Sequence, residues 1–558
     1  MTTPQNSETS RPPLRKARVR RPRPDIWVLG SALIGLVVLA PLAAVVWIAF
    51  HPTENIWPHL LSTVLPRYFM ATLRMMLGVG VLSAAMGAGA AWLVVMYRFP
   101  GSRALDYALL FPMAIPAYVG AYALVDFLDY AGPLQLVLRG TFGWTSARDY
   151  WFPEIHSEPA AILVLSAALY PYVYLLTRSA LREQSGASYE VARSLGLGPW
   201  GLFWRLGLPL VRPAIAVGVA LTMMETVADF GTVSTFGVQT LTTGVFSTWL
   251  NGGNAGGAAQ IAGVVLLLVL VLLSLEYFSR RNARFHRQSR ASRPVTPIEL
   301  RGLWGWLAAA LCAVPFGLGF VLPTAVMLGH ALTKPHLWLA PGLATAAFNT
   351  VIVGGIAAIL TVSAALFLVY GVRMAGRTFA RTVLGVTVLG YAMPGAVLAV
   401  GLLIPLAALD HRVADAVLAV TGHDPGLLLT GTSAAIVLAY LVRFFGIAQG
   451  AVDSAFGRIS PSLPMAARSL GRGVGGTLRD VYLPLMRGSV LAALLLVFVE
   501  CVKELPATLL LRPFNFNTLS TRVYELASLE RIGEAAPAAL IVTAMGLVAV
   551  ALLVRATR

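Results

Sequence analysis

Charged residues are scarce in this sequence, and their scarcity excludes an ordinary soluble protein. Only 12% of the 558 residues are charged and 57% are hydrophobic, whereas soluble domains carry about 25% charged residues. The mean hydropathy of +0.74 agrees. The alternating pattern of a membrane barrel is absent, so we expect spanning helices that satisfy their own backbone hydrogen bonds. The predicted fold class is an all-α integral membrane protein.

Cysteine and lysine are also rare, and both shortages exclude particular chemistries. Cys312 and Cys501 fall inside apolar runs, with no spacing that suggests a disulfide framework or a metal site. The lysines are Lys16, Lys334 and Lys503, and none follows a glycine. A P-loop needs a Gly-Lys-Ser/Thr ending so that backbone amides and the lysine hold phosphates. We therefore expect no nucleotide hydrolysis, and no catalytic residues, in this chain.

Long apolar runs are what the sequence has in abundance. A helix needs about 20 residues to cross a bilayer. The first run is longer than the ~7 to 15 residues of a signal-peptide core, so we expect an uncleaved first span. The candidate spans cover roughly residues 26–50, 69–97, 104–128, 160–178, 209–235, 258–278, 303–328, 346–372, 381–408, 428–446, 484–505 and 535–554. We therefore expect about twelve transmembrane helices.

Arginines gather in alternate connections between these runs, which accounts for the net charge of +17. The basic segments are the tail, 98–103, 178–212, 280–301, 373–381, 443–487 and the C-terminus. With twelve spans all of them fall on one face, as the positive-inside rule requires of the cytoplasmic side. We expect a multi-pass protein of the bacterial inner membrane with both termini in the cytoplasm. We therefore expect the basic residues to contact membrane lipid, and we expect no binding of nucleic acid.

The chain contains an internal duplication. Ala192-Arg193-Ser194-Leu195-Gly196 recurs as Ala467-Arg468-Ser469-Leu470-Gly471, and Leu208-Pro209-Leu210 recurs as Leu483-Pro484-Leu485, both at an offset of 275. Thr240-Leu241-Thr242-Thr243 is echoed 278 residues later by Thr518-Leu519-Ser520-Thr521, which implies a small insertion. We expect a basic tail (1–25), a first six-span half (26–278), a basic cytoplasmic linker (279–301) and a second six-span half (302–558). An even number of spans makes the repeats parallel, with a translocation path where they meet.

Each half carries the same cytoplasmic loop, at 186–209 and at 460–484. Good helix formers precede Gly196 and Gly471, and a left-handed glycine commonly ends a helix. A proline then follows 13 positions later at the start of an apolar run. The pattern predicts a short helix, a tight turn and a second helix, twice.

These loops resemble the EAA signature of binding-protein-dependent ABC importer permeases. The matching residues are Glu190, Ala192, Gly196, Leu208 and Pro209 in the first half and Ala466, Ala467, Gly471, Leu483 and Pro484 in the second. The duplicated Arg193 and Arg468 belong to the same candidate coupling loops. The resemblance implies a type I importer permease whose two coupling helices dock in two copies of a cytoplasmic ABC ATPase. It also implies a periplasmic solute-binding protein, and ATP and Mg bound by the ATPase, with no cofactor bound by this chain. Val191 and Met465 depart from the signature, and Met465 implies unequal contacts with the two ATPase subunits.

Ionisable residues interrupt two of the predicted spans. Glu225 and Asp229 lie in the fifth and Glu500, Lys503 and Glu504 in the eleventh. Each such side chain costs at least about 2.5 kcal/mol at bilayer depth, so it normally faces a cavity or a partner. Spacing of four places each carboxylate pair on one helix face. Two interpretations follow: ion pairs with Lys503 that lock the halves together, or a path for a cationic substrate, since hard cations favour oxygen ligands.

Two longer segments make the resemblance to a particular group of permeases more specific. Glu225 to Thr232 and Lys503 to Phe516 are similar to the fused permeases of ferric iron importers. This similarity implies iron delivered by a periplasmic binding protein, with transient contacts at Glu225 and Glu500 and no stable metal site. Related permeases carry thiamine, phosphonates or polyamines. A secondary transporter with two parallel six-helix halves is the alternative from another class, but it would not explain the duplicated coupling loops.

Overall fold

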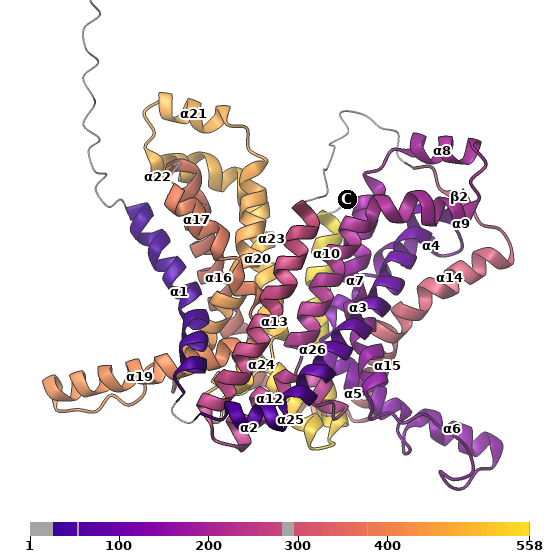
Figure 1. The fold of residues 1–558 in the computed structure, drawn as a ribbon, viewed down its shortest axis with the longest axis horizontal. Helices are drawn as coiled ribbons and strands as arrows, with labels where there is room; N and C mark the ends of the chain where they lie inside the picture. The colour runs from indigo at the N-terminus through magenta and orange to yellow at the C-terminus, as the bar shows by residue number, and fades with distance from the viewer. Residues whose placement is uncertain (1–25, 53–54, 282–294, 376–377, 557–558) are drawn as a thin grey trace, which may run out of the picture.

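The computed structural model describes residues 26–52, 55–281, 295–375 and 378–556, and most of them are helical (Figure 1). The predicted tail and most of the predicted linker lie outside the described residues. The helices of the first half are α1 (Ile26–Phe50), α2 (Trp57–Ser62), α3 (Leu65–Met96), α4 (Ser102–Ala108), α5 (Ala117–Leu128), α6 (Pro133–Phe142), α7 (Glu158–Arg182), α8 (Gly186–Ser194), α9 (Pro199–Gly201), α10 (Leu208–Ala228), α11 (Gly231–Thr235), α12 (Leu241–Phe246) and α13 (Ala255–Arg281).

The second half is built from a similar succession of helices. Its helices are α14 (Leu303–Phe316), α15 (Leu322–Thr333), α16 (Leu343–Ala375), α17 (Thr378–Val386), α18 (Leu389–Ala392), α19 (Gly395–Thr421), α20 (Ala434–Gly457), α21 (Ser462–Ser469), α22 (Val474–Thr477), α23 (Leu483–Lys503), α24 (Pro506–Leu511), α25 (Leu519–Ser528) and α26 (Ile532–Ala556). Short 3-10 turns (Phe111–Ala114, Pro335–Leu339) and π-helical turns (Leu202–Gly207, Ser247–Asn251, Gly317–Val321, Leu478–Tyr482) join some of them.

The membrane-spanning class predicted from the sequence is confirmed. Within the described ranges, 11 helical segments are long and apolar enough to cross a bilayer, or up to 12 if one bent pair counts as a single span. That pair is the predicted span 104–128, which is not one straight helix: Ser102–Ala114 and Ala117–Phe142 meet at 96°. Pro112 and Pro116 lie at the break, where a missing N–H interrupts the helical hydrogen bonds. The predicted span 381–408 is likewise interrupted, before Pro394.

The duplication is visible in hydrogen bonds that recur in both halves. The Thr72 hydroxyl accepts the backbone N–H of Leu241 at 2.9 Å, and Thr350 accepts that of Leu519 at 2.8 Å. Each bond fixes a helix that begins with a threonine capping box, α12 in the first half and α25 in the second. Helices α8 and α21 lie at the same end of the molecule, on opposite sides of it, and α12 and α25 lie at the other end (Figure 1). The halves therefore run in the same direction, as a parallel duplication requires.

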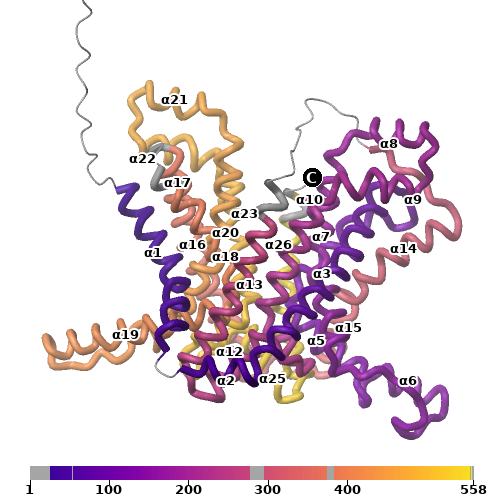
Figure 2. Tube along the Cα trace, viewed as in Figure 1, coloured from indigo at the N-terminus to yellow at the C-terminus, as the bar shows by residue number. Residues whose placement is uncertain are grey.

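The first span of each half packs against the opposite half (Figure 2). Helix α1 lies along α16 and α19, and the Trp27 ring stacks on Phe367 with centroids 4.6 Å apart. Helix α14 packs against α3 and α4. The chain just before α14 is fixed there too, because β2 (Ile298–Glu299) pairs in parallel with β1 (Tyr97–Arg98). The two halves are thus joined, because each packs its first helix against the other.

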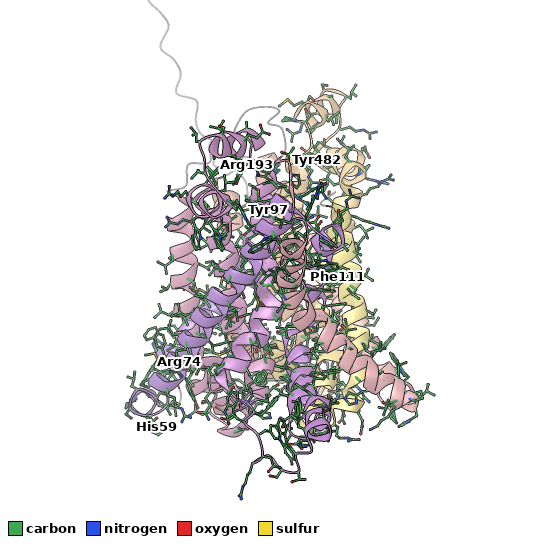
Figure 3. All side chains as sticks on the ribbon, turned by 90° about the vertical axis from the view of Figure 1, so that its right-hand side faces the viewer. His59, Arg74, Tyr97, Phe111, Arg193 and Tyr482 are labelled. Carbon is green, nitrogen blue, oxygen red and sulfur yellow. The ribbon has the colours of Figure 1, made fainter. Side chains whose placement is uncertain are left out.

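Charged side chains mark the two ends of the bundle. Figure 3 shows Arg193 at the end that carries α8, and His59 and Arg74 at the opposite end. Arg74 forms an ion pair with Glu158 at 2.8 Å there, between the starts of α3 and α7. The apolar length between these ends is the part that the membrane covers.

Candidate functional site

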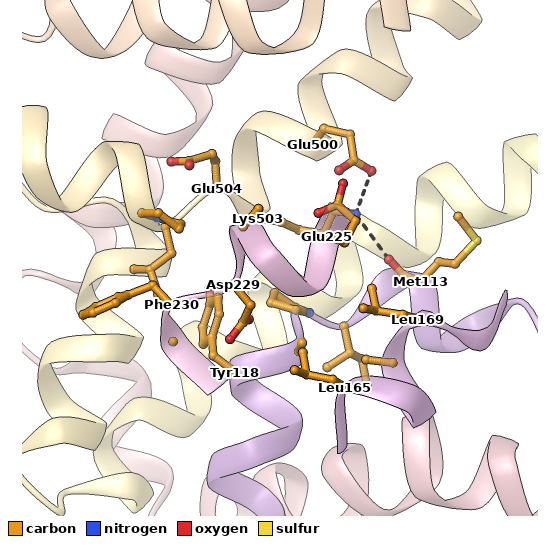
Figure 4. Close-up of a pocket in the computed structure, with 18 of the residues that line it drawn as sticks. Met113, Tyr118, Leu165, Leu169, Glu225, Asp229, Phe230, Glu500, Lys503 and Glu504 are labelled. Atoms are coloured by element: carbon orange, nitrogen blue, oxygen red, sulfur yellow. Dashed lines mark hydrogen bonds and ion pairs between the residues drawn. The ribbon is translucent and has the colours of Figure 1, made fainter. Parts of the chain in front are cut away.

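The residues predicted for the substrate path surround one cavity of about 140 Å³ (Figure 4). Helices α5, α7 and α10 of the first half contribute to its wall, and so do α18, α20 and α23 of the second. The predicted path residues that line it are Glu225, Asp229, Glu500, Lys503 and Glu504. The structure therefore brings all five together, at a place where the two halves meet.

Two of the four carboxylates lie beyond the helices that were expected to carry them. Helix α10 ends at Ala228 and α23 ends at Lys503, so Asp229 and Glu504 follow in extended backbone. The prediction that each carboxylate pair shares one helix face is therefore wrong. Asp229 instead accepts hydrogen bonds from the Val233 N–H and the Thr232 hydroxyl, both at 3.0 Å. Its carboxylate thereby caps the start of α11.

Glu504 likewise caps the start of α24, and its carboxylate also pairs with a positively charged side chain. Its carboxylate accepts the N–H groups of Ala507 and Thr508, both at 3.0 Å. Its side chain is 1% exposed, and its Oε1 lies 3.5 Å from the Arg443 Nη1. Gly395 makes room for this pair, because an added Cβ there would lie 2.4 Å from the Glu504 Oε1 and 2.5 Å from the Arg443 Nη1. The capping bonds and the ion pair together satisfy a charge that would otherwise be costly to bury.

Arg443 is the cavity residue that the sequence analysis misplaced. It was assigned to the basic cytoplasmic segment 443–487, but it lies near the middle of α20 and lines the cavity. The mostly apolar stretch from Phe444 to Val452 was the available signal, because it continues the helix past the arginine. Its counterpart at the offset of 275, Ala168, lines the same cavity without a charge. The second half therefore supplies the additional cation.

Glu225 and Glu500 have fewer partners than the two capping carboxylates. The Tyr391 hydroxyl donates to the Glu225 Oε1 at 3.3 Å. The Lys503 Nζ donates to the Glu500 Oε1 at 2.7 Å and to the backbone oxygen of Met113 at 3.3 Å, as the dashed lines in Figure 4 show. An incoming cation would therefore have to replace fewer existing contacts at these two glutamates than at the two capping carboxylates.

Among the described residues, the ion pairs that line the cavity do not cross between the halves. Lys503 pairs with Glu500 one turn away on the same helix, and Arg443 pairs with Glu504 within the second half. The cavity contacts that do cross are hydrogen bonds, from Lys503 to Met113 and from Tyr391 to Glu225. Away from the cavity, His330 of α15 and Asp126 of α5 also join the halves, at 2.8 Å. Locking of the halves at the cavity would thus depend on hydrogen bonds, while both ion pairs lie within the second half. In the described ranges, no group of three or more His, Cys, Asp or Glu is placed to hold a metal ion.

The two predicted coupling loops have the same backbone geometry. Helices α8 and α21 end in Schellman turns: Leu197 N–H bonds to Ala192 O at 3.1 Å, and Arg472 N–H bonds to Ala467 O at 3.0 Å. Gly196 has φ +84° and Gly471 has φ +82°, so the predicted left-handed glycines are confirmed. Pro209 and Pro484 each stand at the second position of the following helix, α10 and α23.

Each loop buries one side and exposes another. Ala192 and Ala467 are buried, while Glu190, Arg468 and Ala466 are exposed. Aromatic side chains fasten the buried sides: Trp92 of α3 lies against Tyr189 in the first half. In the second half, the Tyr370 hydroxyl of α16 donates to the backbone oxygen of Val474. Trp92 and Tyr370 occupy equivalent positions, at the 278 offset. Each loop therefore contacts the matching long helix of its own half.

The exposed sides of both loops also carry large apolar side chains. Leu195 is 78% exposed and Leu470 is 83% exposed, each beside its turn glycine. Val191 and Met465 are also exposed, and Met465 stands where the first loop has the acid Glu190 at the 275 offset. A group of exposed apolar side chains surrounded by polar residues commonly marks a site of contact with another protein. The second loop presents a less acidic surface than the first.

Comparison with known proteins assigns this architecture to a family. Residues 80–284 match the family described as the binding-protein-dependent transport system inner membrane component. The sulfate transport system permease protein CysW of Synechocystis is 30% identical over 209 residues, 36% of this chain and 69% of that protein. The chain belongs to this family, and is the multi-pass, non-enzymatic inner membrane permease of an ABC-type importer.

Its similarity to particular relatives extends further along the chain. The Fe(3+)-transport system permease protein FbpB 2 of Haemophilus influenzae is 26% identical over 525 residues, which cover 93% of this chain and 96% of that protein. The molybdenum transport system permease protein ModB of Escherichia coli is 28% identical over 210 residues, 37% of this chain and 88% of that protein. A match over the full length of a relative supports the fused arrangement of two permease halves in one polypeptide.

Proposed function

We propose that this chain carries ferric iron across the inner membrane, from a periplasmic binding protein to the cytoplasm. The observation that carries the proposal is the group of four carboxylates around one cavity between the halves. The full-length similarity to a ferric iron permease supports the same substrate. Iron is here a passing substrate.

The carboxylates would act by replacing water around the cation. A trivalent ion loses strongly favourable hydration when it enters a low-dielectric region, and negative oxygen ligands offset part of that loss. Glu225 and Glu500 would offer those oxygens, because their present partners are a tyrosine hydroxyl and a lysine on the same helix. Lys503 and Arg443 would balance the cavity's charge between transport cycles and move away from the carboxylates when iron enters.

The energy would come from a separate cytoplasmic ATPase that holds ATP and Mg, two copies of which bind the two coupling loops. The exposed Leu195 and Leu470 are the apolar contacts we assign to that interface. The loops would then face the cytoplasm, as would both termini, and a periplasmic binding protein would dock at the end that carries α12 and α25. Trp92 and Tyr370 would transmit loop motion to the long helices α3 and α16.

The substrate assignment predicts the outcome of a transport comparison. The permease, its ATPase and its binding protein are reconstituted in vesicles, and ATP-dependent uptake of radiolabelled ferric iron, molybdate and sulfate is measured. We expect iron uptake and no oxyanion uptake, because carboxylates repel an oxyanion in a low-dielectric cavity. Relatives of this chain include molybdenum and sulfate permeases, so these oxyanions are the relevant competitors. Oxyanion uptake would contradict the proposal and would assign the binding role to Arg443 and Lys503.

The assembly predicts a definite stoichiometry. Because both coupling loops lie in one chain, one permease should bind two ATPase subunits and no second permease. Native mass spectrometry of the detergent-solubilised complex measures the composition directly. A complex with two permease chains would show that one fused chain does not make the whole pore.

A further inference from the structure

A helical arm leaves the bundle at the end opposite the coupling loops. The arm comprises residues 129–157: it follows α5, contains α6 (Pro133–Phe142) and returns to α7 (Figure 1). In the view of Figure 1 the arm extends sideways from the bundle, and its return segment lies on the side of α6 that faces away from the coupling loops. None of the functions discussed above uses it.

The arm is a folded unit with a defined inner face. Gln135 is buried, and its Nε2 donates to the backbone oxygen of Leu128 at 2.7 Å while its Oε1 accepts from the Tyr150 hydroxyl. The Trp144 ring stacks between Phe142 and Tyr150, with centroid distances of 4.7 Å to each. These contacts join α6 to the return segment and fix which side of the helix points outward.

The outward side of α6 is apolar. Pro133, Leu136, Val137 and Gly140 recur at the spacing of one helix face, opposite Gln135, and all four are exposed. Leu136 is 54% exposed and Val137 is 65% exposed. The charged residues of the arm lie elsewhere: Arg139 stacks on the Tyr130 ring at 3.9 Å, Asp129 precedes α6, and Arg148, Asp149 and Glu154 belong to the return segment.

The return segment has the character of a surface in water. Asp149 accepts the backbone N–H groups of Ser146 and Thr145, both at 2.8 Å. These backbone bonds lower the pKa of the Asp149 carboxyl, so it stays charged at neutral pH. An apolar face on one side and a charged face on the other is the pattern of a helix that lies along a membrane surface.

We propose that α6 lies in the lipid headgroup region, with Leu136 and Val137 inserted toward the acyl chains and the return segment in water. Two observations favour lipid over a protein partner. Gln135 faces the return segment, so the opposite, apolar face of α6 lies on the side nearer to the coupling loops and the spans (Figure 1). The helix that leads into the arm, α5, packs against the span α15, where Leu328 and Leu332 are also exposed.

The second half does not repeat this surface. At the 275 offset, Gln135 corresponds to Asp410, which is also buried and also binds its return segment, through the N–H of Thr430 at 2.7 Å. The positions that match Leu136 and Val137 are His411 and Arg412, which are polar and exposed. At these two positions we therefore assign the lipid contact to the first half.

Spin labels at two positions of the arm test the assignment. The variants Val137→Cys and Arg148→Cys are labelled in the full-length permease in phosphatidylethanolamine–phosphatidylglycerol vesicles. Cys312 and Cys501 are buried, so the new surface cysteine takes the label. Collisions with oxygen, which concentrates in lipid, and with a nickel chelate, which stays in water, are measured for each label. Arg412→Cys on the second arm is the matched comparison.

We expect the label at position 137 to lose nickel accessibility and gain oxygen accessibility relative to the labels at 148 and 412. Equal nickel accessibility at 137 and 148 would overturn the proposal. So would protection at 137 that arises only after addition of the loaded binding protein, because that result assigns the face to a protein partner. The measurement needs no substrate transport, so its outcome is independent of whether iron is the cargo.

Discussion

Replacing Glu225 or Glu500 by glutamine should abolish ferric iron uptake, with a loss of well over tenfold in each variant. Glutamine keeps the size of the side chain and removes the negative charge that would offset the desolvation of the cation. A loss of only about 1.4 kcal/mol at the barrier already lowers the rate tenfold. Uptake of radiolabelled iron into vesicles measures the effect, beside co-purification of the ATPase, which should be unchanged.

Two further variants make this result specific to the cavity. Lys503→Met should have a milder effect, because it removes the partner of Glu500 and leaves every carboxylate in place. Glu158→Gln should have none, since Glu158 pairs with Arg74 at a partly exposed site outside the cavity. Normal uptake in both Glu225→Gln and Glu500→Gln would remove these carboxylates from the path and leave their contacts with Tyr391 and Lys503 as structural.

Valine at either turn glycine of the coupling loops should uncouple the ATPase while the protein still inserts in the membrane. Gly196 and Gly471 have φ values of +84° and +82°, where a β-branched residue costs about 1 kcal/mol or more. No described atom lies within 4 Å of a Cβ added at either position, so the strain comes from the backbone alone. The measurement is substrate-stimulated ATP hydrolysis by the reconstituted complex.

The chain provides matched controls two residues further along each loop. Gly198 and Gly473 have φ values of −70° and −69°, in extended backbone that valine adopts readily. An added Cβ there also meets no described atom within 4 Å. Gly198→Val and Gly473→Val should therefore keep stimulated ATP hydrolysis. Full stimulation in Gly196→Val and Gly471→Val would show that the turns do not transmit the motion.

The features that the sequence predicted are those with a local physical cause. A bilayer sets the length of an apolar run, so the spans and the fold class could be predicted from hydropathy. A left-handed turn requires glycine, so Gly196 and Gly471 could be placed at helix ends. The duplicated Thr240 and Thr518 segments became equivalent capping boxes for the same reason, because capping depends on residues three positions apart.

The coupling residues and the carboxylates of the path could also be proposed from the sequence, as residues that recur at one offset. Their roles within the site could not. Asp229 and Glu504 cap short helices, because the chain leaves the helix one residue before each of them. A helix end in the middle of an apolar run has no hydropathy signal, so the expected shared helix face was wrong.

What only the tertiary structure decided are the contacts between segments that lie far apart in the chain. Arg443 is tolerated inside a span because Glu504 lies 61 positions later and Gly395 leaves space beside both. Helix α1 covers α16 and α19, which begin about 290 residues or more after α1 ends. A hydropathy pattern specifies that a face must be buried, and it does not specify against which segment. The sequence by itself determined the spans, the repeat and the loop turns, while packing decided the exchange of first helices, the composition of the cavity and the lipid-facing arm.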